Sequence, residues 1–231
     1  MFFIYDEDGE EYHTDYFTKK ELDELLAPIR NKTFEALDKR NLFETQKGLT
    51  SRQMNKGIFG NVIEQGVLGM KPDPKPKPDI TIDYTDSIES YRGILKTEVK
   101  TTGVVENRNG IVPKERVSVT GVSIGNIEKE AWEDSRYYHK LRHILWIFYL
   151  YEYKDKKNKE KFSPYEQRMF KVLTYGFQHL DEDKKDLDIF KNDWTIRISW
   201  TNISEYKVRL GISMQIRIPI RFFICIILMQ H

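Results

Sequence analysis

The sequence has little cysteine, almost no net charge and no apolar run long enough to cross a membrane. Its single cysteine, Cys225, excludes an internal disulfide framework and a cysteine-rich zinc module. With 37 lysines and arginines against 36 aspartates and glutamates, the net charge is +1, so any surface that binds a polyanion must be a local patch. The apolar run at residues 222–229 is shorter than the roughly 20 residues that a spanning helix needs. We therefore expect no membrane-spanning segment.

The N-terminus lacks the pattern of a cleavable secretion signal, because acidic residues follow a very short apolar start. These are Asp6, Asp8, Glu10 and Glu11. Together with the scarcity of cysteine, this favours a reducing cytoplasm. A chain of 231 residues can bury one substantial core. We predict residues 51–231 as one large domain, preceded by a helical extension at residues 1–50; no pattern indicates the oligomeric state.

Several segments carry helical signals. Thr18 and Glu21 have the spacing of a capping box, which predicts a helix from Lys19 to Leu26. The segment Gly57–Leu68 has apolar residues at helical intervals, which predicts a helix with one buried stripe. Further helices are predicted from about Lys32 to Leu42, from Pro164 to Phe177 and from Lys184 to Trp194.

Other segments have the composition of strands. The alternating prolines of residues 71–79 forbid helix and predict an extended connector that leads into a strand at Ile80 and Ile82. Further strands are predicted at Ile94–Val105, Ser118–Gly125 and Ile144–Tyr151, the last as a continuous apolar strand buried on both faces. The charged stretch Lys129–Arg142 is helical or irregular. We predict an α/β fold with a central mixed sheet flanked by helices.

Two charged residues of the second strand are candidates for chemistry. The period of a strand puts Glu98 and Lys100 on one face and turns Val99 into the core on the other. Glu-x-Lys in an exposed strand is common, and two solvated side chains are its ordinary interpretation. The alternative is that both side chains act on one ligand.

Carboxylates elsewhere favour this alternative. Asp79 ends the proline-rich connector, where it can converge with Glu98 on a hard divalent cation such as Mg²⁺. A metal held in this way lowers the pKa of a bound water and stabilises charge on a phosphate, while Lys100 orients the water or offsets phosphate charge. Glu64, on the preceding predicted helix, adds a carboxylate beside this metal or for a second one. This arrangement is typical of many nucleases.

Longer motifs resemble one family of such enzymes. Lys56-Gly57-x-x-Gly60-x-x-x-Glu64, Leu68-Gly69, Lys77-Pro78-Asp79 and Glu98-Val99-Lys100-Thr101 follow one another in the order seen in the core of the MutH family. A second block runs without a gap from Trp132-Glu133-x-Ser135 through His139-Lys140-Leu141 to Leu145-Trp146, and a weaker match is Asp193-Trp194. The family comprises mismatch-repair nicking enzymes and type II restriction endonucleases that cut at GATC.

The resemblance implies a restriction-endonuclease-like fold and Mg²⁺-dependent cleavage of double-stranded DNA. It implies metal ligation by Asp79 and Glu98 with Lys100 beside them, and auxiliary roles for Glu64 and Lys56. Lys140 becomes a candidate for phosphate contact or support of the site. His139 and His143 are more simply interpreted as surface or capped residues than as ligands, and Trp132 and Trp146 as core residues.

The chain departs from the family pattern at two places. Eighteen residues separate Asp79 from Glu98, more than the family's short gap, so Asp83 within this insertion is a rival for the first metal ligand. The tail from about residue 197 is atypical and has no convincing loop for reading base edges, although Gln215, Arg217 and Arg221 are candidates.

Three functions therefore stay open. The first is an active endonuclease of restriction type, with a GATC-like target implied by the resemblance. The second is a silent half of a two-part restriction enzyme, which binds DNA without cutting it. The third is a mismatch-repair nicking enzyme with a protein activator. The intact Glu-x-Lys favours cleavage, whereas the stretched spacing and the atypical tail favour the silent role.

Overall fold

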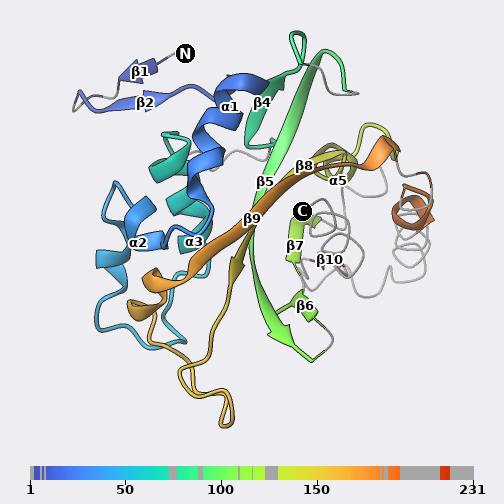
Figure 1. The fold of residues 1–231 in the computed structure, drawn as a ribbon. Coiled ribbons are helices and arrows are strands. Elements are labelled where there is room, and N and C mark those ends of the chain that lie inside the picture. The colour runs from blue at the N-terminus through green and yellow to red at the C-terminus, as the bar shows by residue number, and fades with distance from the viewer. Residues whose placement is uncertain are drawn as a thin grey trace, which may run out of the picture.

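The computed structural model describes residues 3–5, 7, 9–72, 77–87, 91–108, 110–115, 117–122, 130–182, 184, 187–192 and 214–218, and of 117–122 and 214–218 it describes the backbone alone. At its centre is a six-stranded mixed sheet with the order β3-β4-β5-β8-β9, in which β6 also pairs with β5 (Figure 1). The predicted α/β fold with a central mixed sheet is confirmed.

Parallel and antiparallel pairs alternate across this sheet. β3 is parallel to β4, β4 antiparallel to β5, β5 parallel to β8, and β8 antiparallel to β9. The strands are β3 Tyr16–Thr18, β4 Ile80–Asp83, β5 Ile94–Asn107, β6 Gly110–Pro113, β8 His143–Leu150 and β9 Lys171–His179. β5 is therefore paired over its whole length, with β4 at residues 94–97, with β8 at residues 98–104 and with β6 at residues 104–107.

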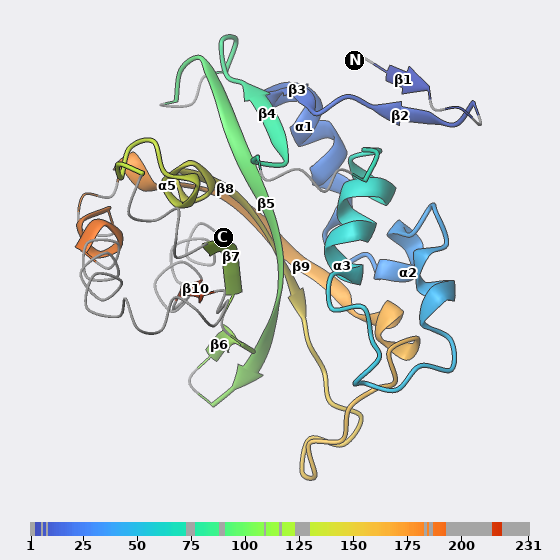
Figure 2. The ribbon, with the colours of Figure 1, turned by 180° about the vertical axis from the view of Figure 1, so that it is seen from behind.

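The two faces of the sheet are covered by different elements. Helices α1, α2 and α3 lie on one face, and α5 lies on the other, with β7 and β10 (Figures 1 and 2). β8 shows the division, because Leu145, Ile147 and Tyr149 belong to the core on the helical side, whereas Trp146 and Phe148 belong to the core on the α5 side. This alternation confirms the prediction of a strand buried on both faces.

The helical face is built mainly from the first 70 residues. Its elements are α1 Lys19–Leu26, the 3-10 helices Ala27–Ile29 and Leu42–Gln46, α2 Phe34–Leu37, α3 Ile58–Asn61 and a π-helix at Val62–Val67. The predicted capping box is present, because the Glu21 N–H donates to Thr18 Oγ1 at 3.2 Å and the Thr18 N–H donates to Glu21 Oε2 at 3.0 Å. Residues 1–50 also contain β3, so they share the central sheet with the rest of the chain.

A short hairpin precedes these helices. β1 Phe3–Tyr5 pairs antiparallel with β2 Glu11–His13.

On the face of the sheet opposite the helices α1, α2 and α3, α5 spans Arg136–Leu141, and β7 Val117–Val122 pairs antiparallel with β10 Met214–Ile218. The buried side chains of Trp132 and Trp146 confirm that both are core residues. No helix in the described part of the chain is long and apolar enough to cross a membrane.

One predicted helix is wrong. Residues 164–177 form a 3-10 helix at Glu166–Met169 and then β9, Lys171–His179, rather than one helix. Phe170, Val172 and Thr174 are buried at every second position, which is the period of a strand. The apolar strand β8 needs a partner on this edge, and pairing with it outweighs the local helical pattern.

Two other predicted helices are modified. In the segment Lys32–Leu42 only Phe34–Leu37 is α-helical, because the Asp38 side chain accepts the N–H groups of Leu42 and Phe43, both at 2.8 Å, and starts a separate 3-10 helix. The segment Gly57–Leu68 changes from α3 into the π-helix. A 3-10 helix spans Leu180–Glu182, and residues 184 and 187–192 are helical, in agreement with the helix predicted there.

Candidate active site

β4 and β5 bring Asp79 beside Glu98. Asp79 lies one residue before the antiparallel pair Ile80–Thr97, and its Oδ2 accepts the Val99 N–H at 2.8 Å. Of the residues between them, those that the structure describes form β4, a turn and the start of β5. The long spacing between Asp79 and Glu98 therefore forms an antiparallel hairpin, whose two strands run out and back and leave both residues at the same end.

Glu98 is a buried carboxylate held by two lysines. Only 1% of it is exposed. Its Oε1 accepts from Lys100 Nζ at 2.5 Å, and Lys140 Nζ donates to Oε1 at 2.8 Å and to Oε2 at 2.7 Å. Burial raises the pKa of Glu98, and the positive charge of Lys100 opposes this shift. As predicted, Glu98 and Lys100 share a face of the strand while Val99 is buried on the other.

Lys140 reaches Glu98 from the α5 side of the sheet. The hydroxyl of Ser135 caps α5 by accepting the Tyr138 N–H at 3.1 Å, and Tyr137 and Leu141 anchor the helix in the α5-side core. This packing buries Lys140 and directs its amine to the carboxylate of Glu98. Of the two roles considered for Lys140, the geometry favours support of the site.

Glu64 is a third carboxyl group in the same electrostatic environment. It lies on the π-helix, where the Leu68 N–H donates to Ile63 O at 2.9 Å. Burial raises the pKa of Glu64 to about 7; the negative charges of Asp79 and Glu98 add to the shift, and that of Lys100 opposes it. We refer to Asp79, Glu98, Lys100, Lys140 and Glu64 as the acid–lysine cluster.

Other candidates lie apart from this cluster. Asp83 is at the far end of β4, opposite Ile94, and accepts hydrogen bonds from Tyr16 Oη and Thr85 Oγ1, both at 2.5 Å. Asp83 lies four positions after Asp79, or about 13 Å along the strand, so the geometry favours Asp79 as the first ligand. Lys56 is exposed before α3, and nothing in the described part of the chain ties it to the cluster.

The side chains predicted to read base edges lie outside the residues that the structure describes. Gln215 and Arg217 belong to β10, whose backbone pairs with β7, but their side chains lie outside the described residues, as do Arg221, Asp193 and Trp194. Base readout by these residues therefore stays a prediction.

The cluster suits a cation that keeps much of its water. Within the described residues, no group of three or more acidic, histidine or cysteine side chains is arranged to hold a metal ion, so Asp79, Glu98 and Glu64 do not form a three-carboxylate site. Mg²⁺ is commonly bound by one or two carboxylates, with waters and substrate phosphates completing its shell. Asp79 and Glu98 would form such a pair, and their negative charges add to the rise that burial causes in the pKa of Glu64, a contribution that a bound cation would offset.

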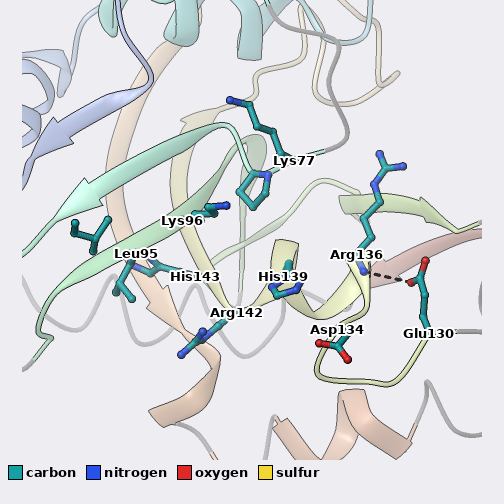
Figure 3. Close-up of a pocket in the computed structure, with 11 residues that line it drawn as sticks. Lys77, Leu95, Lys96, Glu130, Asp134, Arg136, His139, Arg142 and His143 are labelled. Carbon is teal, nitrogen blue, oxygen red and sulfur yellow. Dashed lines mark hydrogen bonds between the residues drawn. The ribbon is translucent and has the colours of Figure 1, made fainter. Parts of the chain in front are cut away.

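Two pockets flank Lys77, Pro78 and Asp79. The first, called here the α5 pocket, has a volume of about 680 Å³ and is lined by residues before β4, at the start of β5 and around α5 (Figure 3). The second, of about 430 Å³, contains Asp79 itself and lies against the N-terminal hairpin. Lys77 lines both pockets, and its Nζ donates to Asp15 Oδ2 at 2.6 Å. Lys96 and Arg136, which line the α5 pocket, carry no signal in the sequence, because isolated basic residues form no motif.

A pair of histidines adjoins the α5 pocket, and one of them, His143, helps to line it. His143 is buried, with its Nδ1 2.6 Å from Thr97 Oγ1 and its ring stacked on that of His179. Burial lowers the pKa of His143 to about 2 and that of His179 to about 3. The proximity of His179 and Arg142 adds to the shift of His143, whereas Asp181 opposes that of His179.

This pair predicts a loss of stability in mild acid. Both rings are neutral in the folded protein, whereas unfolding returns each pKa to about 6.5, so below that pH the unfolded state binds more protons. The contribution is present above pH 6.5 and falls as the pH drops, by at most about 1.4 kcal/mol per pH unit for each histidine. Urea unfolding at pH 7.5 and 5.5 measures this. In His179→Phe, which keeps an aromatic stack, the difference between the two pH values should shrink by about 1 kcal/mol; an unchanged difference would contradict the prediction.

The middle of the chain matches a known protein family. The family model described as "MutH: DNA mismatch repair enzyme MutH" matches residues 68–184, just over half of the chain. The match covers β4, β5, α5, β8 and β9, with every residue of the acid–lysine cluster except Glu64. It confirms the resemblance noted in the sequence. No curated protein matches this chain.

Proposed function

Since this chain belongs to the MutH family of DNA mismatch repair enzymes, whose members are DNA endonucleases of the restriction-enzyme kind, we propose that it is an active, Mg²⁺-dependent endonuclease that cuts double-stranded DNA. The observation that carries this proposal is the convergence of Asp79, Glu98 and Lys100 at one end of the β4–β5 hairpin. A silent DNA-binding half would have no need for a buried carboxylate held between two lysines.

The residues of the acid–lysine cluster would have different roles in cleavage. Asp79 and Glu98 would hold the metal, and a bound Mg²⁺ would supply Lewis acidity and a water of lowered pKa. Lys140 holds the carboxylate of Glu98 in a fixed orientation through both of its oxygens. Lys100 is the more exposed of the two lysines, with 21% of its side chain accessible. It can therefore turn from Glu98 to a phosphate oxygen and offset the charge that develops there.

Removal of the metal should abolish cleavage. We expect purified protein to nick or linearise plasmid DNA in Mg²⁺ or Mn²⁺ and to leave it intact in EDTA, with activity restored when excess Mg²⁺ is added back. Gel analysis of supercoiled, nicked and linear plasmid measures this and separates single-strand from double-strand cutting. Duplex binding without cutting in either metal would contradict the proposal and support the silent role.

We further propose a GATC-like target and a place in restriction or mismatch repair, which rest on membership of the family. Sequencing the ends of cut plasmid tests the target, and methylated and unmethylated plasmids should be compared. Ends scattered over unrelated sequences would remove the GATC assignment and leave the cleavage chemistry unaffected.

A further inference from the structure

The α5 pocket is placed to continue the path of a bound strand. Pro78 precedes Asp79, Lys96 lies two residues before Glu98 on the same face of β5, and His139 precedes Lys140. The pocket thus borders three members of the acid–lysine cluster. Two strand residues span about 7 Å, a length over which a DNA strand that rises about 3.4 Å per nucleotide presents one or two further phosphates.

Two of the basic side chains that line the pocket form no ion pair within the described part of the chain. Of its four lysines and arginines, Lys77 is paired with Asp15 and Arg142 with Asp181. Lys96 and Arg136 are exposed, and neither side chain has an acidic partner in the described part of the chain. Figure 3 shows Lys96 on the β5 side of the pocket and Arg136 on the α5 side.

The acidic residues of the pocket are confined to its α5 side. Glu130 accepts the backbone N–H of Arg136 at 3.4 Å, and Asp134 lies in the turn that leads into α5. On the β5 side Lys96 stands beside Ile94, which is 61% exposed and offers an apolar surface that a deoxyribose can cover. A pocket of about 680 Å³ with cations on two sides suits a segment of sugar-phosphate backbone.

We propose that the α5 pocket binds the DNA strand next to the scissile phosphate, with Lys96 and Arg136 contacting its backbone phosphates. This inference rests on the proposed function and extends it by naming where the substrate lies. Lys96 and Arg136 are positioning residues, because they bind phosphates other than the one that is cut. They set affinity and register, and they carry no sequence information.

The test is duplex binding as a function of salt in EDTA, where no cleavage occurs. The Lys96→Gln/Arg136→Gln variant should bind a fluorescent duplex several-fold more weakly than the wild type. Its slope of log K against log salt should be smaller in magnitude by about 2, since each lost phosphate contact removes about 0.9. In Mg²⁺, KM should rise while kcat at saturating duplex stays within about two-fold, because the cluster is unchanged.

The matched control is Lys156→Gln/Lys157→Gln. It removes the same charge from exposed positions beyond the opposite end of β8 and should leave the slope unchanged. An unchanged slope in the Lys96/Arg136 variant, or an equal loss in the control, would overturn the inference. Failure of the wild type to bind duplex at any salt would instead overturn the proposed function. Both variants should unfold at the wild-type urea concentration, because all four side chains are exposed.

Discussion

Replacing Glu98 by glutamine should lower the single-turnover rate of plasmid cleavage at least about a thousand-fold, which corresponds to about 4 kcal/mol of transition-state stabilisation. The amide has the size of the carboxylate but lacks the negative charge that would hold a divalent cation. Binding of duplex in EDTA should persist, because the cations of the α5 pocket are untouched. Quenched-flow or gel-based single-turnover assays measure the rate.

Glu106→Gln is the control for this loss. Glu106 lies on the same strand, eight residues further along, and is exposed. Its replacement should leave the rate within about two-fold of the wild type. Cleavage by Glu98→Gln within about ten-fold of the wild type would remove Glu98 from the chemistry and, with it, the proposed division of roles.

The ion pair between Glu98 and Lys140 should show a large coupling in a double-mutant cycle. Glu98→Gln leaves the amine of Lys140 buried without its partner, and Lys140→Met leaves Glu98 with Lys100 alone. Each single change should cost about 3 to 5 kcal/mol of unfolding free energy, whereas the double change should be less destabilising than their sum by about 3 kcal/mol. Equilibrium urea unfolding of the four proteins measures the cycle.

A second cycle on Glu44 and Lys47 gives the reference value. Both side chains of this pair are about half exposed, so its coupling should stay below about 1 kcal/mol. If the Glu98–Lys140 cycle were additive to within about 0.5 kcal/mol, the two groups would not depend on each other. The arrangement of the buried carboxylate would then need another explanation.

Local patterns in the sequence predicted those features that depend on near neighbours. The capping box at Thr18 needs only residues three positions apart, and the shared face of Glu98 and Lys100 needs only the period of a strand. The long gap between Asp79 and Glu98 was ambiguous, because either Asp79 or Asp83 can lie beside Glu98, depending on which residues of β4 and β5 pair with each other. The register of these two strands decides which aspartate lies beside Glu98, and this register cannot be read from the sequence.

Features that depend on tertiary pairing were missed. β9 has enough helical character locally to predict a helix, and only the presence of β8 beside it makes the strand preferable. Lys140 and Glu98 are 42 residues apart and meet because α5 packs across β8. Lys96 and Arg136 likewise gain significance only where β5 and α5 enclose a pocket. No periodicity in the chain encodes these contacts.

The π-helix that carries Glu64 makes this carboxylate separately adjustable. A π turn holds one residue more than an α turn, so loss of a single residue from Val62–Val67 would restore regular helix and rotate Glu64 by about 100°. The strand-borne Asp79 and Glu98 would keep their positions. Related chains that gain or lose this one residue would therefore differ in whether Glu64 lies near Asp79 and Glu98, while their sheet and its lysines stay the same.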